Sequence, residues 1–140
     1  MHRPFTLIIL AATGLAAALF GVACTFTTTI PKPPVYGEPL DSLRAQVRDL
    51  VTCEHFDING EEMTINGKKH SEMTITVVNG RWHPGMDKWE LGKALGGVVK
   101  RSLRDTAEYQ WYIIRFSSEM KNGLSFSQET ISKEFPSKDL

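Results

Sequence analysis

Four Asn-Gly dipeptides constrain how this chain can fold, because both residue types tolerate the positive φ angles of tight turns. They stand at residues 59–60, 66–67, 79–80 and 122–123. Each pair falls between two segments whose apolar spacing predicts a helix or a strand. The four pairs therefore mark the boundaries of the predicted elements, although they do not determine the order of the strands.

Two segments have the apolar spacing of amphipathic helices. The first covers residues 40–53, and Pro39 and Asp41 suit its first turn. The second runs from Asp87, a suitable N-cap, to about Arg104. Glycines inside this helix cost roughly 0.8–1 kcal/mol each relative to alanine. A close approach of the helix backbone to a sheet would offset that cost at Gly92, Gly96 and Gly97.

Four segments have the composition or the alternation of β-strands, namely residues 62–65, 71–78, 109–116 and 124–131. Together with the helices they give the order α, short β, β, α, β, β. This order predicts an α+β fold: a small two-layer sandwich with a three- to four-stranded, mainly antiparallel sheet and two helices on one face. An N-terminal apolar leader precedes this domain.

The leader comprises the first 23 residues, of which 16 are apolar and only Arg3 is charged. A positive start, an apolar run and then small residues are the layout of a secretory signal. The 19 residues of the run, 5–23, are also just long enough to cross a hydrocarbon core of about 30 Å. Three fates stay open: removal by lipoprotein processing, removal by an ordinary signal peptidase, and retention as a single-pass anchor.

The end of the leader, Leu19-Phe-Gly-Val-Ala-Cys24, resembles the lipobox of bacterial lipoproteins. Val22 and Ala23 match that pattern, whereas Gly21 stands where leucine is usual. The resemblance implies that Cys24 is acylated and becomes the first residue of the mature chain. Two or three acyl chains bury enough methylene groups for firm anchoring. A lipid anchor is therefore favoured over a transmembrane helix, and the protein is expected to be exported and held at the cell envelope.

These features divide the chain into four parts. Residues 1–23 are the predicted signal peptide, and residues 24–39 form a tether rich in proline and threonine. Proline removes amide donors and favours extended geometry, so the tether is expected to be a stiff spacer. The alternative is a disordered start of the chain that packs loosely along the domain. The α+β domain is predicted over residues 40–135, and residues 136–140 are a C-terminal tail.

The composition excludes several functional classes. With 16 Lys and Arg against 16 Asp and Glu the formal net charge is zero, which argues against a generally basic nucleic-acid binder. Two cysteines are too few for a disulfide framework or a Cys-rich zinc site. The chain also lacks a nucleophile elbow, a P-loop and a His-Glu-x-x-His motif. No catalytic residue, metal site or cofactor is predicted, and the protein is not expected to be an enzyme.

One alternative is that the protein has a catalytic or a metal-binding activity. Cys53 lies near three histidines, His55, His70 and His83, and this group suggests a small exported enzyme or a metal-binding domain. Without a recognised ligand spacing, the opposite interpretation is favoured: Cys53 is a small apolar residue near a helix end, and His55 faces solvent.

The most distinctive surface candidate is a loop rich in aromatic residues. Trp82, His83, Met86 and Trp89 surround a Pro-Gly pair between a predicted strand and helix, and they offer a possible surface for a protein partner. Tryptophan also readily closes a core at a loop, and this packing role is the favoured interpretation of the two residues. The prediction is therefore a lipid-anchored, non-catalytic binding or accessory module whose membrane partner is lipid and whose oligomeric state is open.

Overall fold

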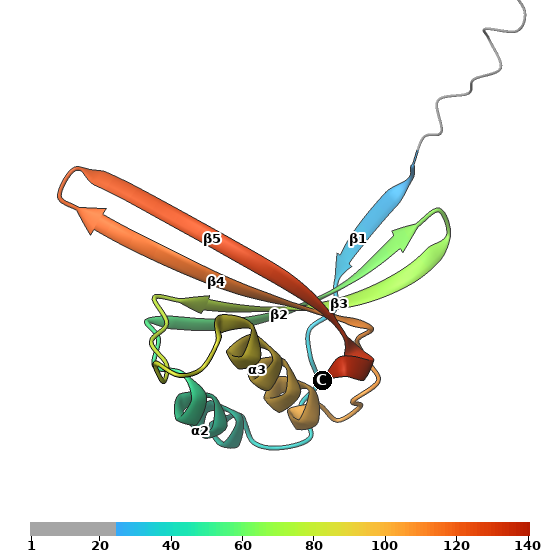
Figure 1. Cartoon of the computed structure of the whole chain (residues 1–140). Helices are drawn as coiled ribbons and strands as arrows, with labels where there is room; N and C mark the ends of the chain where they lie inside the picture. Colours follow the sequence, from blue (N-terminus) through green and yellow to red (C-terminus); the bar gives the residue numbers. More distant parts are fainter. Residues whose placement is uncertain (1–24) are drawn as a thin grey trace, which may run out of the picture.

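The computed structural model of the protein describes residues 25–140, which form two α-helices, five β-strands and a short 3-10 helix (Figure 1). The predicted leader and Cys24 lie outside the described residues. The elements in chain order are β1 (Thr27–Pro31), α2 (Leu40–Leu50), β2 (His55–Ile65), β3 (Lys68–Val78), α3 (Lys88–Ser102), β4 (Trp111–Asn122), β5 (Ser125–Pro136) and η1 (Ser137–Asp139). The predicted α+β class with two helices is confirmed.

All five strands belong to one sheet in the order β1-β2-β3-β4-β5. The prediction of three to four strands is wrong, because β1 adds an edge strand that the sequence analysis assigns to a tether. Three of the four pairings are antiparallel, and only β3 and β4 run parallel. A parallel pair needs a crossover connection, and α3 provides it between these two strands. The sheet is therefore mainly antiparallel, as predicted.

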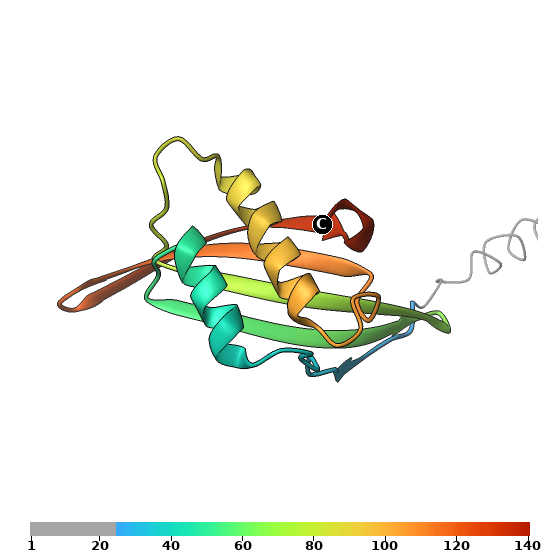
Figure 2. The ribbon, with the colours of Figure 1, turned by 90° about the horizontal axis from the view of Figure 1, so that it is seen from below.

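Both helices cover the same face of the sheet (Figure 2). On β3, Met73, Ile75 and Val77 point toward the helices and are fully buried, while the residues between them are half-buried on the other face. Leu91 and Leu95 of α3 pack into the same core. This alternation is that of a sheet with one face in the core and one toward solvent.

Helix α3 follows the sequence prediction closely. The carboxylate of Asp87 accepts the Trp89 N–H at 2.8 Å, and Glu90 accepts the Asp87 N–H at 3.2 Å, so the two acids form a capping box. The helix also approaches the sheet closely, since a Cβ at Gly92 would lie 3.3 Å from Cγ2 of Ile114. The predicted close approach to the sheet is found at Gly92 and Gly96, whereas a Cβ at Gly97 would meet only Arg101 of the same helix.

The Asn-Gly pairs do not all form turns. Asn66 and Gly67 have φ angles of 50° and 79° and close a two-residue hairpin between Ile65 and Lys68, as predicted. Asn59 and Gly60, in contrast, lie inside β2, where they pair with Thr74 and Met73. The prediction of a turn at this pair is wrong, because Gly60 serves a close packing contact and has no positive φ angle.

Both ends of the described chain take part in the fold. Residues 27–31, inside the expected tether, pair with residues 61–65 of β2, which suits their β-branched composition. Prolines at 31, 33 and 34 then end the pairing, since proline cannot donate to a sheet. The predicted tail contains η1, and the Lys100 ammonium donates to the Leu140 carbonyl at 3.3 Å.

The hairpin of β4 and β5 extends beyond the rest of the sheet (Figure 1). Ser117 pairs with Val78, the last residue of β3, so β4 continues past the end of its neighbour as far as Asn122. The projecting tip carries exposed apolar side chains, namely Met120, Leu124 and Phe126.

Candidate binding groove

A hollow lies between α2 and β2, and we call it the α2–β2 groove. Its volume is about 630 Å³. Ligand sites in proteins commonly have volumes of 300–1,000 Å³ and mostly apolar walls. The groove has such walls, since its lining residues are Tyr36, Leu40, Leu43, Arg44, Val47, Arg48, Val51, Thr52, Cys53, Phe56 and Ile58.

The groove arises from the way α2 sits over the edge of the sheet (Figure 2). Leu43 and Val47 are buried at helical spacing on the inner side of α2, and Val51 follows them at its end. Phe56 and Ile58 of β2 are half-buried and share the face that points toward the helices. Both rows of apolar side chains line the groove.

The groove is open along β2 because β1 ends early. β1 pairs only with residues 61–65 of β2, and the last contact on this edge is the Lys32 N–H donating to the Gly60 carbonyl at 2.8 Å. The part of β2 that contains Phe56 and Ile58 is therefore left without a neighbouring strand on its outer side. The proline-rich stretch after β1 thus creates the opening of the groove.

Two arginines stand at the rim. Arg44 and Arg48 are four residues apart on α2, so they lie one helical turn from each other on the same side. Arg44 contacts Asp41 at 3.3 Å, but both side chains are exposed, and such a pair is weak. Arg48 forms no ion pair with any residue of the described chain. The guanidinium groups are thus available to a carboxylate or phosphate beside an apolar cavity.

Cys53 is half-buried in the wall of the groove and forms no disulfide within residues 25–140. Burial disfavours the thiolate and raises the pKa of this thiol above its ordinary value. Activated cysteine nucleophiles have a lowered pKa instead. The thiol therefore lines the groove as a polarisable apolar group. Its rate of alkylation can report whether a ligand occupies the groove.

The histidines that are close to Cys53 in sequence are not gathered around it in space. His55 pairs with Val78 at one end of the β2–β3 hairpin, and His70 pairs with Met63 near the other end. His83 lies in the loop before α3, where its Nδ1 accepts the Gly85 N–H at 3.2 Å. Across residues 25–140, no three His, Cys, Asp or Glu side chains are grouped so that they could hold a metal ion.

The aromatic loop singled out from the sequence packs largely against the core. The rings of Trp82 and Trp89 lie 5.6 and 6.0 Å from the ring of Phe116, and the Trp82 indole donates to the Met86 carbonyl. His83 is exposed, while Trp82, Met86 and Trp89 are half-buried. Trp82 also lines a second hollow of about 240 Å³ at the base of the projecting hairpin. The four residues therefore combine a packing role with a small accessible surface.

The α2–β2 groove is not predicted from the sequence. The apolar stripe of α2 predicts core residues, and this is correct for Leu43 and Val47. The groove exists because α2 overhangs a part of the sheet that β1 leaves uncovered. The one signal in the sequence is the cluster of prolines after Pro31, which predicts the end of any strand there.

None of the helices in residues 25–140 is long and apolar enough to cross a membrane. Comparisons with protein-family models, with curated proteins and with solved structures found no match to this chain.

Proposed function

We propose that the protein is an exported, lipid-anchored and non-catalytic binding module of the cell envelope, which holds an amphiphilic ligand in the α2–β2 groove. The observation that carries the proposal is the groove itself, an apolar cavity of about 630 Å³ with two arginines at its rim. The ligand class that fits is a molecule with an apolar chain and an anionic head, such as a fatty-acid-like amphiphile.

The shape and chemistry of the groove support both parts of such a ligand. Phe56 and Ile58 on one side and Leu43 and Val47 on the other provide apolar contact along the chain of the ligand. Burying apolar surface stabilises a complex by roughly 25 cal/mol per Å² before the cost of immobilising the ligand is subtracted. The rim arginines add charge-assisted hydrogen bonds to the head, and these determine which head group is preferred.

Support for the anchor comes from the sequence. The apolar leader ends at a cysteine that follows Val22 and Ala23, in a pattern similar to a lipobox. The first strand begins at Thr27, so the folded part starts directly after that cysteine. A binding module held in this way would stay at the envelope while its groove faces the aqueous side.

The groove is tested with dodecanoate and with a dodecyl chain that carries a trimethylammonium head. In protein comprising residues 25–140, dodecanoate should protect Cys53 from alkylation, because the thiol lines the groove. The cationic amphiphile should protect it more weakly at the same concentration. Changing both Arg44→Gln and Arg48→Gln should weaken dodecanoate binding about two- to thirtyfold, since each exposed charge contact contributes roughly 0.2–1 kcal/mol.

Arg115→Gln is the matched control, because Arg115 is an exposed arginine on β4 outside the groove. This substitution should leave dodecanoate binding unchanged. Equal protection of Cys53 by both amphiphiles, or no protection by either, would contradict an anion-selective groove. Calorimetric titration gives the affinities independently of the alkylation rates.

The anchor is tested with Cys24→Ser in the full chain. In bacteria fed a labelled fatty acid, the unaltered protein should carry the label and sediment with membranes, whereas Cys24→Ser should lose the label. Intact mass of the mature chain distinguishes acylation at Cys24 from simple cleavage and from a retained leader. An unlabelled mature chain that starts at residue 24 would refute the lipid anchor while leaving the groove unaffected.

A further inference from the structure

We infer that the tip of the β2–β3 hairpin rests on the headgroup surface of the bilayer, so that the sheet itself holds the projecting hairpin away from the membrane. This inference rests on the proposed acylation of Cys24. It adds an orientation: one named surface faces lipid, and the opposite end of the sheet faces the aqueous side.

Only a short stretch of chain separates the proposed anchor from the fold. Phe26 is joined to the hairpin tip by two hydrogen bonds: its N–H donates to Oδ1 of Asn66 at 3.3 Å, and its carbonyl accepts the Asn66 N–H at 3.1 Å. Two peptide units separate Cys24 from Phe26, and they reach about 7 Å at most. An acylated Cys24 therefore leaves the tip no room to stand clear of the bilayer.

The expected stiff tether would have left the orientation of the domain relative to the membrane undetermined. A stiff spacer over residues 24–39 would reach roughly 45 Å at about 3 Å per residue and would leave the domain free to adopt any orientation. Because Thr27–Pro31 is a strand of the sheet, that reach is lost. The direction of the sheet relative to the anchor is then determined by hydrogen bonds.

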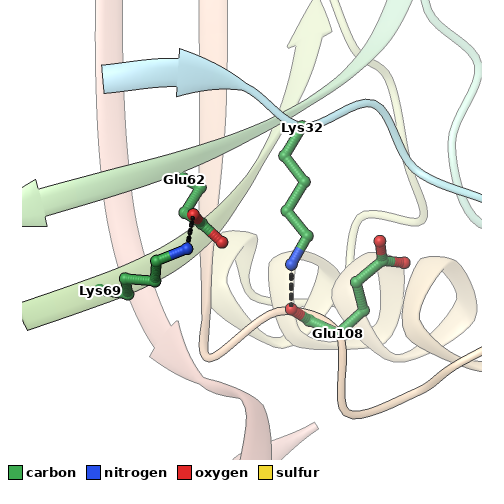
Figure 3. A network of polar contacts seen from close by, with 4 residues as sticks. All are labelled: Lys32, Glu62, Lys69 and Glu108. Atoms are coloured by element: carbon green, nitrogen blue, oxygen red, sulfur yellow. Dashed lines mark hydrogen bonds and ion pairs between the residues drawn. The ribbon is translucent and has the colours of Figure 1, made fainter. Parts of the chain in front are cut away.

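The chemistry of the tip suits a headgroup surface. Phe26 is 78% exposed beside the anchor point, and an aromatic ring is well accommodated at the level of lipid headgroups. Lys68 and Lys69 are exposed at the tip. Lys69 contacts Glu62 at 2.9 Å (Figure 3). Lys68 forms no ion pair within residues 25–140. The ammonium groups can meet lipid phosphates, to which basic residues near a membrane are attracted.

The register of the sheet places the other hairpin far from this surface. β3 runs away from the tip from Lys68 to Val78, and β4 runs parallel to it and continues from Ser117 to Asn122. At about 3.3 Å per residue this path is roughly 50 Å long. Figures 1 and 2 both show the two hairpin tips at opposite ends of the molecule. The exposed apolar tip of β4–β5 is thereby presented on the aqueous side.

The test measures depth in the full, acylated chain reconstituted in vesicles of phosphatidylglycerol and phosphatidylcholine. A fluorescent thiol label is placed at Lys68→Cys or at Leu124→Cys, each in a Cys53→Ser background so that one thiol is labelled. A nitroxide on the lipid headgroups acts as quencher. Quenching should be at least about fivefold stronger for Lys68→Cys, because the headgroup region is only several Å thick and Leu124 lies far beyond it.

A second pair of labels, Lys69→Cys and Phe126→Cys, repeats the comparison in case one variant does not fold. Far-ultraviolet circular dichroism and intact mass are recorded for every variant, so acylation is known in each sample. If the chain is acylated and both tips are quenched equally or not at all, the inference is wrong and the anchored module still stands. If no acyl group is present, the proposed anchor itself fails, and the mass shows this directly.

Discussion

Gly60→Ala should lower the free energy of unfolding of residues 25–140 by about 3 kcal/mol, because the new methyl group has no space. A Cβ at this position would lie 2.1 Å from the Lys32 carbonyl oxygen and 2.4 Å from the Tyr109 hydroxyl oxygen. The first of these atoms belongs to the backbone, so relief requires β1 to move away from β2. The melting temperature should fall by roughly 10 °C, given the size of the domain.

The local structure explains why the loss is large. The Tyr109 hydroxyl donates to the Lys32 carbonyl at 2.5 Å, and the Lys32 N–H donates to the Gly60 carbonyl at 2.8 Å. The Lys32 ammonium also donates to the Glu108 carbonyl at 3.2 Å (Figure 3). All three hydrogen bonds involve Lys32, whose backbone can approach β2 closely because Gly60 has no side chain. Displacing Lys32 therefore breaks several hydrogen bonds at once.

Gly85→Ala is the matched control for this substitution. The same methyl group at Gly85 would meet only the His83 ring, at 3.4 Å, which is an ordinary contact. Replacing glycine by alanine in a compatible conformation changes stability by less than about 1 kcal/mol. Urea denaturation of the two variants compares the effects. Equal losses in both would show that Gly60 is not needed for the close approach of β1.

Alkaline conditions should destabilise the protein through its buried tyrosines. Burial raises the pKa of Tyr109 to about 12 and raises that of Tyr112 further, whereas tyrosine in an unfolded chain titrates near pH 10. Below about pH 10 both states keep the proton, and the stability contribution is fully present. Between about pH 10 and 12 only the unfolded chain releases the tyrosine proton, so the free energy of unfolding falls as pH rises. Each buried tyrosine lowers it by up to about 1.4 kcal/mol per pH unit.

Tyr112→Phe separates this effect from other alkaline changes. The Tyr112 hydroxyl is fully buried and has no hydrogen-bond partner among residues 25–140. Removing it should raise stability at pH 7 by about 1 kcal/mol and should also reduce the loss between pH 9 and pH 11.5. Urea midpoints at the two pH values give both numbers.

Tyr36→Phe serves as the comparison, because Tyr36 is half-buried and the shift of its pKa is caused mainly by partial burial. Its effect on the alkaline loss should be smaller than that of Tyr112→Phe. Stability that stays constant from pH 9 to pH 11.5 in the unaltered protein would contradict the proposed linkage.

Local sequence signals predicted those elements whose formation depends on neighbouring residues. Asp87 caps α3 as expected, and the Asn66-Gly67 hairpin needs only the two positive φ angles that these residues tolerate. The alternation along 71–78 likewise predicted which side of β3 is buried. In each case the cause lies within a few residues of the effect, so a single sequence carries the information.

The edge strand and the candidate site depend on contacts between distant segments. The threonine-rich stretch 27–31 forms a strand only because residues 61–65 present an edge to it. Gly60 is in a strand because Lys32 and Tyr109, 28 and 49 residues away in sequence, pack against its missing side chain. The α2–β2 groove needs the same three-dimensional arrangement, since its walls come from a helix and a strand that are joined through a loop.

The sequence by itself determined the α+β class, the capped second helix, the central alternating strand and the apolar leader with its cysteine. These follow from side-chain periodicity and from local turn and capping chemistry. Only the tertiary structure decided that residues 27–31 of the expected tether form a fifth strand, that an apolar groove opens beside it, and that the two hairpin tips lie at opposite ends. The physical reason is that strand pairing and cavity formation depend on which surfaces remain uncovered after the chain has folded.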